Sequence, residues 1–178
     1  MTGKTFFNAV VNGKADILGQ FLTILRATKS DYCVIGGLAV NAYAEPVVSL
    51  DLDVVIAANR LEAVRLAVSK KGFKVESFEH SLNLRKAGSD LRIQIQTDAR
   101  YQLFIPRARP KNVLGYRMNV AAVEDVLRGK IWACQDAKRR PSKRQKDLAD
   151  IMRVLEIYPA FHRLVPAEIK KASLQIDK

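Results

Sequence analysis

The sequence predicts an α+β domain in which a mixed β-sheet is flanked by helices and followed by a C-terminal helical portion. Over roughly the first hundred residues, short apolar runs alternate with helix-like segments, and two longer segments with apolar residues three and four apart come after them. The chain has 178 residues and 48% hydrophobic content, enough for a substantial core. We expect a single domain over residues 1–178, with an α/β core at about 1–105 and basic C-terminal helices at about 120–158.

The expected elements follow one another along the chain. Helices are predicted near residues 14–28, 38–44 and 61–71, and strands near 31–36, 50–57 and 72–75. The turn at residues 87–89 separates two further apolar alternations, which predict a hairpin of strands 82–85 and 91–97. Periodic apolar residues predict helices near 123–137 and 143–157, and residues 159–178 are expected to form a short tail with a final helix.

Two aspartates, Asp51 and Asp53, lie one residue apart in an apolar run. Alternate side chains of a strand share a face, so the two carboxylates project together while Leu50, Leu52 and Val54 turn to the core. Mg²⁺ (or Mn²⁺) is usually held by one or two carboxylates together with substrate phosphates and water. The pair therefore predicts an incomplete metal cage that a nucleoside triphosphate (NTP) completes, although isolated Asp-x-Asp pairs also occur at strand ends and in turns without any metal.

A glycine pair, Gly36 and Gly37, stands between the predicted strand at 31–36 and the helix at 38–44. Glycines let the backbone approach phosphate oxygens, and the free amides at a helix N-terminus favour an anion. The pair is therefore a candidate phosphate cradle. The competing interpretation is a tight turn with no ligand.

Lys130 falls within a helical stripe of apolar residues. A lysine on such a stripe either extends its ammonium to the edge or points it into a cleft that holds negative charge. In the next helix, the Lys143–Asp147 and Lys146–Asp150 pairs are four residues apart, which is the spacing of salt links on a helix surface. The apolar residues around Lys130 are Val123, Val126, Leu127, Ile131 and Cys134.

In this order, the motifs resemble the nucleotidyltransferase superfamily, in which a strand, a Gly-Gly or Gly-Ser turn and a helix lead to a strand with Asp-x-Asp. The resemblance covers residues from about 31 to 155. Gly129-Lys130-Ile131-Trp132-Ala133, the Arg139-Arg140 pair and the run from Lys146 to Ile151 are similar to the C-terminal motifs of the toxin-type branch (AbiEii/MenA-like).

The resemblance implies a magnesium-dependent transfer of a nucleoside monophosphate (NMP) from an NTP to a hydroxyl acceptor. It also implies a toxin of the toxin–antitoxin type, with a cognate antitoxin protein as a partner. By the same resemblance, the catalytic residues are Asp51, Asp53 and Lys130, the metal ligands are Asp51 and Asp53, and the nucleotide-binding residues are Gly36, Gly37, Lys130, Lys146, Asp147 and Asp150.

The sequence departs from the family pattern at the third carboxylate, which a later strand usually supplies. Gln94 and Gln96 occupy the expected place, and Asp98 stands at the end of that strand. Glutamine cannot act as the base that deprotonates an attacking hydroxyl. Either Asp98 reaches back, or the reaction proceeds without a protein base, or the chain is a catalytically silent nucleotide- or RNA-binding module. A protein regulated by a companion is a further alternative.

The positive charge is concentrated in the C-terminal part of the chain. Residues 1–99 carry twelve Lys or Arg against ten acids, whereas residues 100–178 carry eighteen against eight. The densest run, residues 138–146, is expected to join two helices. It predicts a nucleic-acid surface that favours an RNA end, of tRNA or another RNA, as the acceptor; an acidic protein partner or simple solvation would explain it too. The residues assigned to this surface are Lys138, Arg139, Arg140, Lys143 and Arg144.

Other classes of protein are excluded by composition. No apolar stretch approaches the roughly 20 residues of a membrane span, and residues 1–7 do not resemble a signal peptide, so we expect a cytoplasmic protein with no membrane partner. Two cysteines cannot build a disulfide framework. Two histidines, both far in sequence from the aspartates, offer little for zinc or for histidine-based nucleophilic catalysis.

Overall fold

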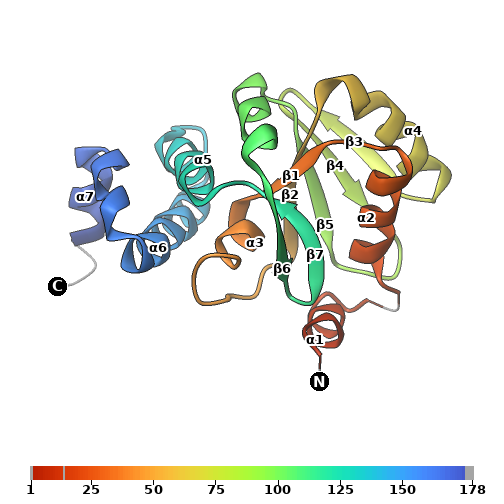
Figure 1. The fold of residues 1–178 in the computed structure, drawn as a ribbon, viewed down its shortest axis with the longest axis horizontal. Coiled ribbons are helices and arrows are strands. Elements are labelled where there is room, and N and C mark those ends of the chain that lie inside the picture. Colours follow the sequence, from red (N-terminus) through yellow and green to blue (C-terminus); the bar gives the residue numbers. More distant parts are fainter. Residues whose placement is uncertain (1, 14, 175–178) are drawn as a thin grey trace.

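The computed structural model describes residues 2–13 and 15–174 and confirms the α+β class (Figure 1). Within these residues, one mixed seven-stranded sheet has the order β3-β4-β5-β2-β1-β7-β6. The predictions for Met1, for residue 14 and for 175–178 lie outside the described residues. The strands are β1 (Tyr32–Ile35), β2 (Asp51–Ile56), β3 (Lys74–Phe78), β4 (Ser81–Arg85), β5 (Arg92–Gln96), β6 (Arg109–Val113) and β7 (Tyr116–Val120).

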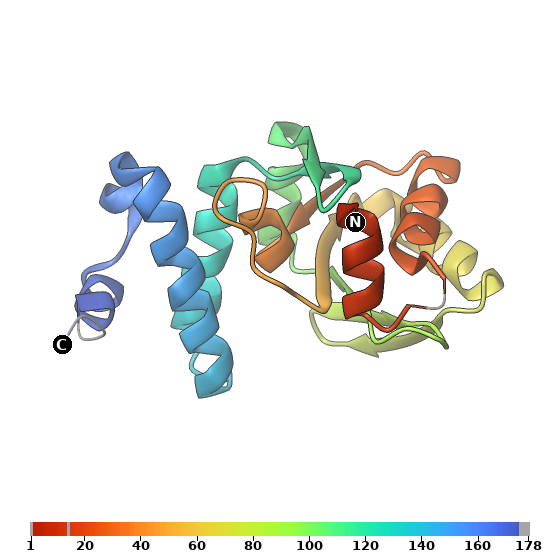
Figure 2. The same ribbon diagram turned by 90° about the horizontal axis from the view of Figure 1, so that it is seen from below.

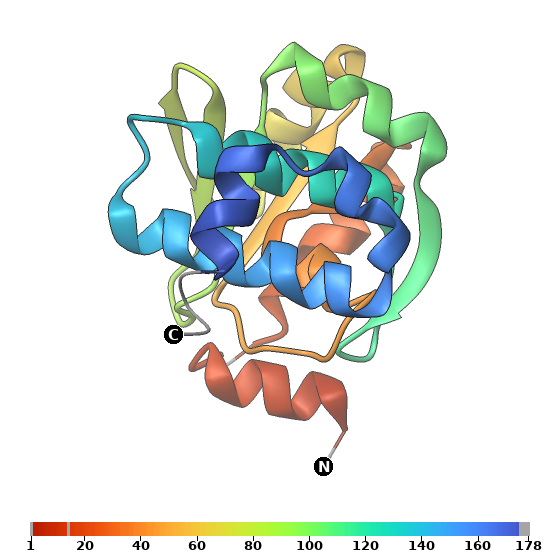
Figure 3. The same cartoon turned by 90° about the vertical axis from the view of Figure 1, so that its left-hand side faces the viewer.

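Helices lie on both sides of the sheet. Figures 1 and 2 show α2 (Ile17–Ala27) and α4 (Leu61–Lys70) on one side, and α5 (Val123–Gln135), α6 (Pro141–Ile157) and α7 (Ala167–Leu174) on the other. α1 (Gly3–Val10) lies below the sheet in Figure 1. Viewed from the C-terminal side, α6 and α7 stand in front of α5 and the sheet (Figure 3). No described helix has the length and apolar character needed to cross a bilayer.

The central strands confirm the predicted alternation of side chains. β2 is antiparallel to β1 and parallel to β5. Leu52 and Val54 are fully buried in the core, so the carboxylates of Asp51 and Asp53 lie on the opposite face. Leu50 was wrongly assigned to the core: it precedes β2 and is 43% exposed. The predicted hairpin is confirmed as β4 paired with β5.

The helix after the glycine pair is shorter than predicted. α3 (Gly36–Val40) begins at Gly36 and ends before Asn41. The Asn41 amide group donates to the Val47 carbonyl at 2.8 Å, and its carbonyl oxygen accepts from the Val47 amide at 3.0 Å. These side-chain bonds stabilise a loop over residues 41–50 in place of further helical turns.

The sequence analysis did not predict α1, the hairpin of β6 and β7, or the 3₁₀ helices η1, η2 and η3 of the described residues. β6 is polar and contains Pro110, which is tolerated because β6 is an edge strand. β7 joins β1 in parallel through one register pair, Val34 with Val120. The 3₁₀ helices are η1 (Ala58–Arg60), η2 (Ala99–Arg107) and η3 (Pro159–Leu164).

The two C-terminal helices are confirmed, with one correction to the basic run. α6 begins at Pro141, a residue suited to the first helical position. Lys143, Arg144 and Lys146 therefore lie on the helix, and only the residues before Pro141 connect α5 to α6. The final helix predicted in the tail is α7.

Candidate active site

A pocket lies between the sheet and α5. The end of β1 and residues of β2 and β5 line it on the side of the sheet. We call it the sheet–helix pocket. It brings together residues that are distant in the sequence and that the motifs singled out: Gly36, Asp53, Gln94, Gln96, Lys130, Arg139 and Asp147.

Gly36 and Asp53 are in close contact within this pocket. The backbone of Gly36 has φ +70°, a left-handed conformation that favours glycine. A Cβ at this position would lie 2.9 Å from the Asp53 Cβ and closer still to its carboxylate. At Gly37, a Cβ would meet Ser49 Oγ at an ordinary 3.6 Å. Gly36 is therefore the glycine that the position of Asp53 requires.

The Asp53 carboxylate is an anion short of partners. Burial raises the pKa of Asp53; nearby Lys130 opposes the shift, and neighbouring Asp51 adds to it. Among the described residues, none donates a hydrogen bond to this carboxylate. A buried carboxylate without donors gains most from a cation.

The donor set fits a magnesium ion that takes its remaining ligands from elsewhere. The described residues contain no group of three or more His, Cys, Asp or Glu that could hold a metal by themselves. Asp51 and Asp53 supply two carboxylates, and Mg²⁺ commonly completes such a pair with substrate phosphates and water.

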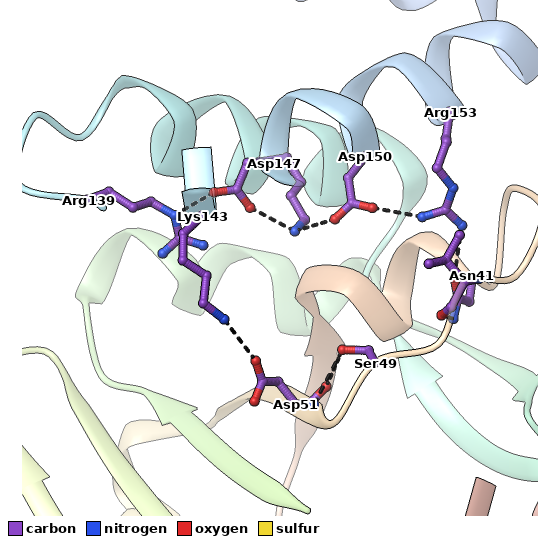
Figure 4. A network of polar contacts seen from close by, with 10 residues as sticks. Asn41, Ser49, Asp51, Arg139, Lys143, Asp147, Asp150 and Arg153 are labelled. Atoms are coloured by element: carbon purple, nitrogen blue, oxygen red, sulfur yellow. Dashed lines mark hydrogen bonds and ion pairs between the residues drawn. The ribbon is translucent and has the colours of Figure 1, made fainter. Parts of the chain in front are cut away.

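Asp51 is neutralised by the protein itself. Its Oδ2 atom lies 2.8 Å from the Arg92 guanidinium and 3.3 Å from Lys143 Nζ. Figure 4 shows Lys143 reaching from α6 toward Asp51 on β2. Its other oxygen, Oδ1, has no partner among the described residues. Asp51 thus connects the sheet to the C-terminal helices.

Lys130 is buried, as the cleft interpretation requires, and is only 7% exposed. Its Nζ atom lies 2.9 Å from Asp147 Oδ1 and 2.6 Å from Asp150 Oδ2. Burial alone would lower the pKa of Lys130, but the two carboxylates outweigh burial and raise it. The negative charge in the cleft therefore comes from α6 itself.

The interpretation of the α6 pairs as surface salt links is wrong. Asp147 and Asp150 are 1% and 4% exposed. Asp147 binds Lys130 and Arg139, while Asp150 binds Lys130 and Arg153, the latter at 2.7 Å (Figure 4). The aspartates face α5 rather than solvent, so the lysines four residues before them are not their partners.

The third-carboxylate candidates occupy different surroundings. Gln94 pairs with Asp53 in the sheet register and faces the pocket. The Gln96 carbonyl oxygen accepts from the Thr97 and Asp98 amides at 3.0 and 3.2 Å, which leaves its NH₂ group for the pocket. Asp98 caps η2 and binds Arg100 at 2.7 Å. Asp98 does not reach back into the pocket.

Two residues that the sequence analysis missed also line the pocket. Asp125, 2% exposed, is bound by Arg107 at 2.6 and 2.8 Å. The Tyr101 ring packs edge-on against Trp132 at 5.3 Å, and burial raises its pKa to about 12, so its hydroxyl stays a hydrogen-bond donor. An acidic residue in the first turn of a helix is common, so Asp125 carried no signal in the sequence.

The predicted nucleic-acid residues separate into three groups. Arg139 lines the sheet–helix pocket. Lys138, Arg140 and Arg144 are exposed. Lys143 and Lys146 line a separate groove beside Asp51. Lys146 was predicted to bind the nucleotide, but it does not line the sheet–helix pocket.

Comparison with solved structures shows that the chain has the fold of nucleotidyltransferases. The antibiotic-resistance factor ANT(2'')-Ia superposes with TM-score 0.59 at 14% identity, over 90% of this chain and 94% of its own. The lincosamide antibiotic adenylyltransferase LnuA gives 0.56 at 13%, over 80% and 98%. A nucleotidyltransferase-like protein from Paracoccidioides brasiliensis gives 0.52 at 21%, over 84% and 75%. No family model and no curated protein matches the sequence.

Proposed function

We propose that this chain, whose fold is that of nucleotidyltransferases, transfers an NMP from an NTP to a hydroxyl acceptor in a magnesium-dependent reaction. One observation carries the proposal: the under-partnered Asp53 carboxylate lies against Gly36 in a pocket that also contains Lys130 and Arg139. A pocket lined by both carboxylates and cations suits a metal-bound polyphosphate, which carries both kinds of charge.

In the proposed reaction, an acceptor oxygen forms a bond to the α-phosphorus while the bond to the bridging oxygen breaks and pyrophosphate leaves. Asp51 and Asp53 would hold magnesium, which supplies charge neutralisation at the phosphates. Gly36 and Gly37 would border the triphosphate. Lys130, after exchanging a carboxylate for phosphate oxygens, would bind the leaving pyrophosphate.

The acceptor proton has few routes within the protein. Gln94 cannot take it, Asp98 is held by Arg100, and Asp125 is held by Arg107. Among the described carboxylates that line the pocket, only Asp53 is free of a hydrogen-bond donor. With Asp53 engaged as a ligand, the proton passes to water, which corresponds to a reaction without a dedicated protein base.

The acceptor that we favour is an RNA end, on the basis of the excess positive charge in residues 100–178. A role as a toxin with a cognate antitoxin is part of the proposal through the family resemblance of the motifs. Cytoplasmic location and a single domain over residues 1–178 remain predictions from the sequence.

The test is incubation of the protein with Mg²⁺, each α-³²P-labelled NTP in turn, total RNA and a soluble-protein extract, followed by gel electrophoresis. Label in a discrete band, lost in the Asp51→Asn/Asp53→Asn double variant, supports nucleotidyl transfer and identifies the nucleotide and the class of acceptor. Absence of label with every NTP, from protein shown to be folded, contradicts the proposal.

A second candidate function is a catalytically silent nucleotide- or RNA-binding module. The observation that favours it is Gln94, which pairs with Asp53 at the place of the third carboxylate. Such a module would show no turnover even as the wild-type protein. Its Asp51→Asn/Asp53→Asn variant would keep the affinity for nucleotide or RNA.

A further inference from the structure

A shallow groove adjoins Asp51 outside the sheet–helix pocket. Four cations from three elements line it: Arg85 from β4, Arg92 from β5, and Lys143 and Lys146 from α6. Residues distant in the sequence thus build one basic surface next to a candidate metal ligand.

The four cations differ in how their charges are balanced. Arg92 and Lys143 both bind Asp51. Arg85 and Lys146 are exposed, and within the described part of the chain the side chain of neither residue has a hydrogen bond or an ion pair. Two of the four cations are therefore unpaired, and two are occupied by the Asp51 carboxylate; a second carboxylate of the groove, Asp90, accepts a hydrogen bond from Asn12.

We propose that this Asp51 groove binds the sugar–phosphate backbone of a single-stranded RNA and brings its end to Asp51. The inference rests on the proposed function, because Asp51 marks the place of transfer. A chain with one phosphate per nucleotide can contact successive cations along a groove. Val48 and Leu50, 53% and 43% exposed, line the same groove and offer apolar surface to a base.

The groove changes the surface predicted from the sequence in two ways. It adds Arg85 and Arg92 from the sheet and Lys146 from α6, and of the predicted residues it keeps only Lys143. Lys138, Arg139, Arg140 and Arg144 lie outside it, and the Arg139 guanidinium binds Asp147. The acceptor surface is thus formed jointly by sheet and helices.

Asp51 competes with RNA phosphates for Arg92 and Lys143. Loss of the Asp51 charge frees both cations, so Asp51→Asn should tighten RNA binding. A variant that removes a candidate catalytic carboxylate would then bind the acceptor better than wild type does.

The experiment measures the anisotropy of a fluorescein-labelled 12-nucleotide RNA titrated with protein in EDTA, without NTP, from 0.05 to 0.3 M NaCl. Each phosphate contact on a single strand contributes roughly fivefold to affinity at 0.1 M salt. Arg85→Gln/Lys146→Gln should weaken binding by about 20-fold. Asp51→Asn should tighten it by about 5- to 20-fold and steepen its salt dependence.

The matched control is Arg60→Gln/Lys70→Gln, which removes the same charge from exposed positions near α4, on the other side of the sheet. This variant should bind RNA within about twofold of wild type. Thermal melting checks that all variants are folded. Equal weakening by both double variants, or unchanged or weaker binding by Asp51→Asn, overturns the proposal.

Competition identifies the kind of occupant. Unlabelled single-stranded RNA should displace the probe, whereas equal displacement by polyglutamate or by double-stranded RNA contradicts a single-stranded RNA groove. The assay contains no NTP or metal. RNA binding with the expected variant pattern but without label transfer supports the groove and contradicts the proposed function. Label transfer without this pattern supports the proposed function and contradicts the groove.

Discussion

At the scale of single residues, the contact between Gly36 and Asp53 gives the sharpest prediction. Gly36→Ala places a side chain at φ +70° and against the Asp53 carboxylate, so the free energy of unfolding should fall by about 1–2 kcal/mol. If Asp53 holds the metal as proposed, nucleotidyl transfer should fall about 10- to 100-fold, because the carboxylate is displaced. Urea unfolding and the label-transfer assay measure the two effects.

Gly37→Ala is the control for this prediction, since the added Cβ meets only ordinary contacts. It should unfold at the same or a slightly higher urea concentration than wild type. Equal destabilisation by the two substitutions would show that the contact with Asp53 is not what requires Gly36.

Asp53 predicts an unusual pH dependence of stability. Burial raises its pKa in the folded state above the ordinary value of 3.8, so its contribution favours folding below that value and is lost as pH rises through the folded pKa. Asp53→Asn should therefore melt at a higher temperature than wild type at pH 7 to 8 in EDTA, with the difference closing toward pH 3.5. Calorimetry over this range provides the measurement; a variant less stable than wild type at pH 7 contradicts it.

At the scale of elements, Arg153 connects α6 to the loop over residues 41–50. Its guanidinium binds Asp150 at 2.7 Å, the Asn41 side chain at 2.9 Å and the Glu45 carbonyl oxygen. Arg153→Met should lower the free energy of unfolding by about 1–3 kcal/mol. Amide hydrogen exchange should accelerate in residues 41–50 and stay unchanged in α5.

A surface arginine supplies the comparison for Arg153. Arg65→Met on α4 removes an exposed pair with Glu62, so its urea unfolding curve should nearly coincide with that of wild type. If both substitutions cost the same, or if exchange in the loop is unaffected by Arg153→Met, then Arg153 does not hold the loop.

The elements also show what sequence patterns can and cannot predict. β5 and the first half of β2 alternate between apolar and polar residues, so the faces of these residues and the hairpin of β5 with β4 could be predicted. β6 is polar and contains Pro110, so its pattern resembles a loop. Asp147 and Asp150 have the spacing of surface pairs, and only the packing of α6 against α5 shows that they serve Lys130. The sequence could predict site residues that share a strand, but not the partners that tertiary packing selects.

At the scale of the whole molecule, the Lys130 contacts attach α5 to α6. Asp150 and Asp147 raise the pKa of Lys130 against the effect of burial, so its contribution to stability is complete below its ordinary value of 10.5 and is lost as pH rises through the folded value. Wild type should lose stability above about pH 10.5. Lys130→Met should lower the free energy of unfolding at pH 7 by about 3–5 kcal/mol, because it leaves buried carboxylates with fewer partners.

Urea unfolding at pH 7, 9 and 11.5 separates these effects. The difference in unfolding free energy between wild type and Lys130→Met should shrink at the highest pH, because the unfolded wild-type lysine has then lost its proton and folding must take a proton up again. A difference that stays constant across this range would show that the charge of Lys130 does not hold the two helices together.

The self-balanced charges of Lys130 in the sheet–helix pocket and of Asp51 beside it also bear on which solutes can bind there. Lys130 has two carboxylates of its own, and Asp51 has two cations. Free inorganic phosphate would have to displace a carboxylate from Lys130, and a metal ion bound at Asp51 would have to displace Arg92 or Lys143, whereas the Asp53 carboxylate has no donor to lose. A ligand that brings both charges together satisfies both sides at once. The proposed function therefore implies that a metal ion and a polyphosphate bind this site more tightly together than either does alone.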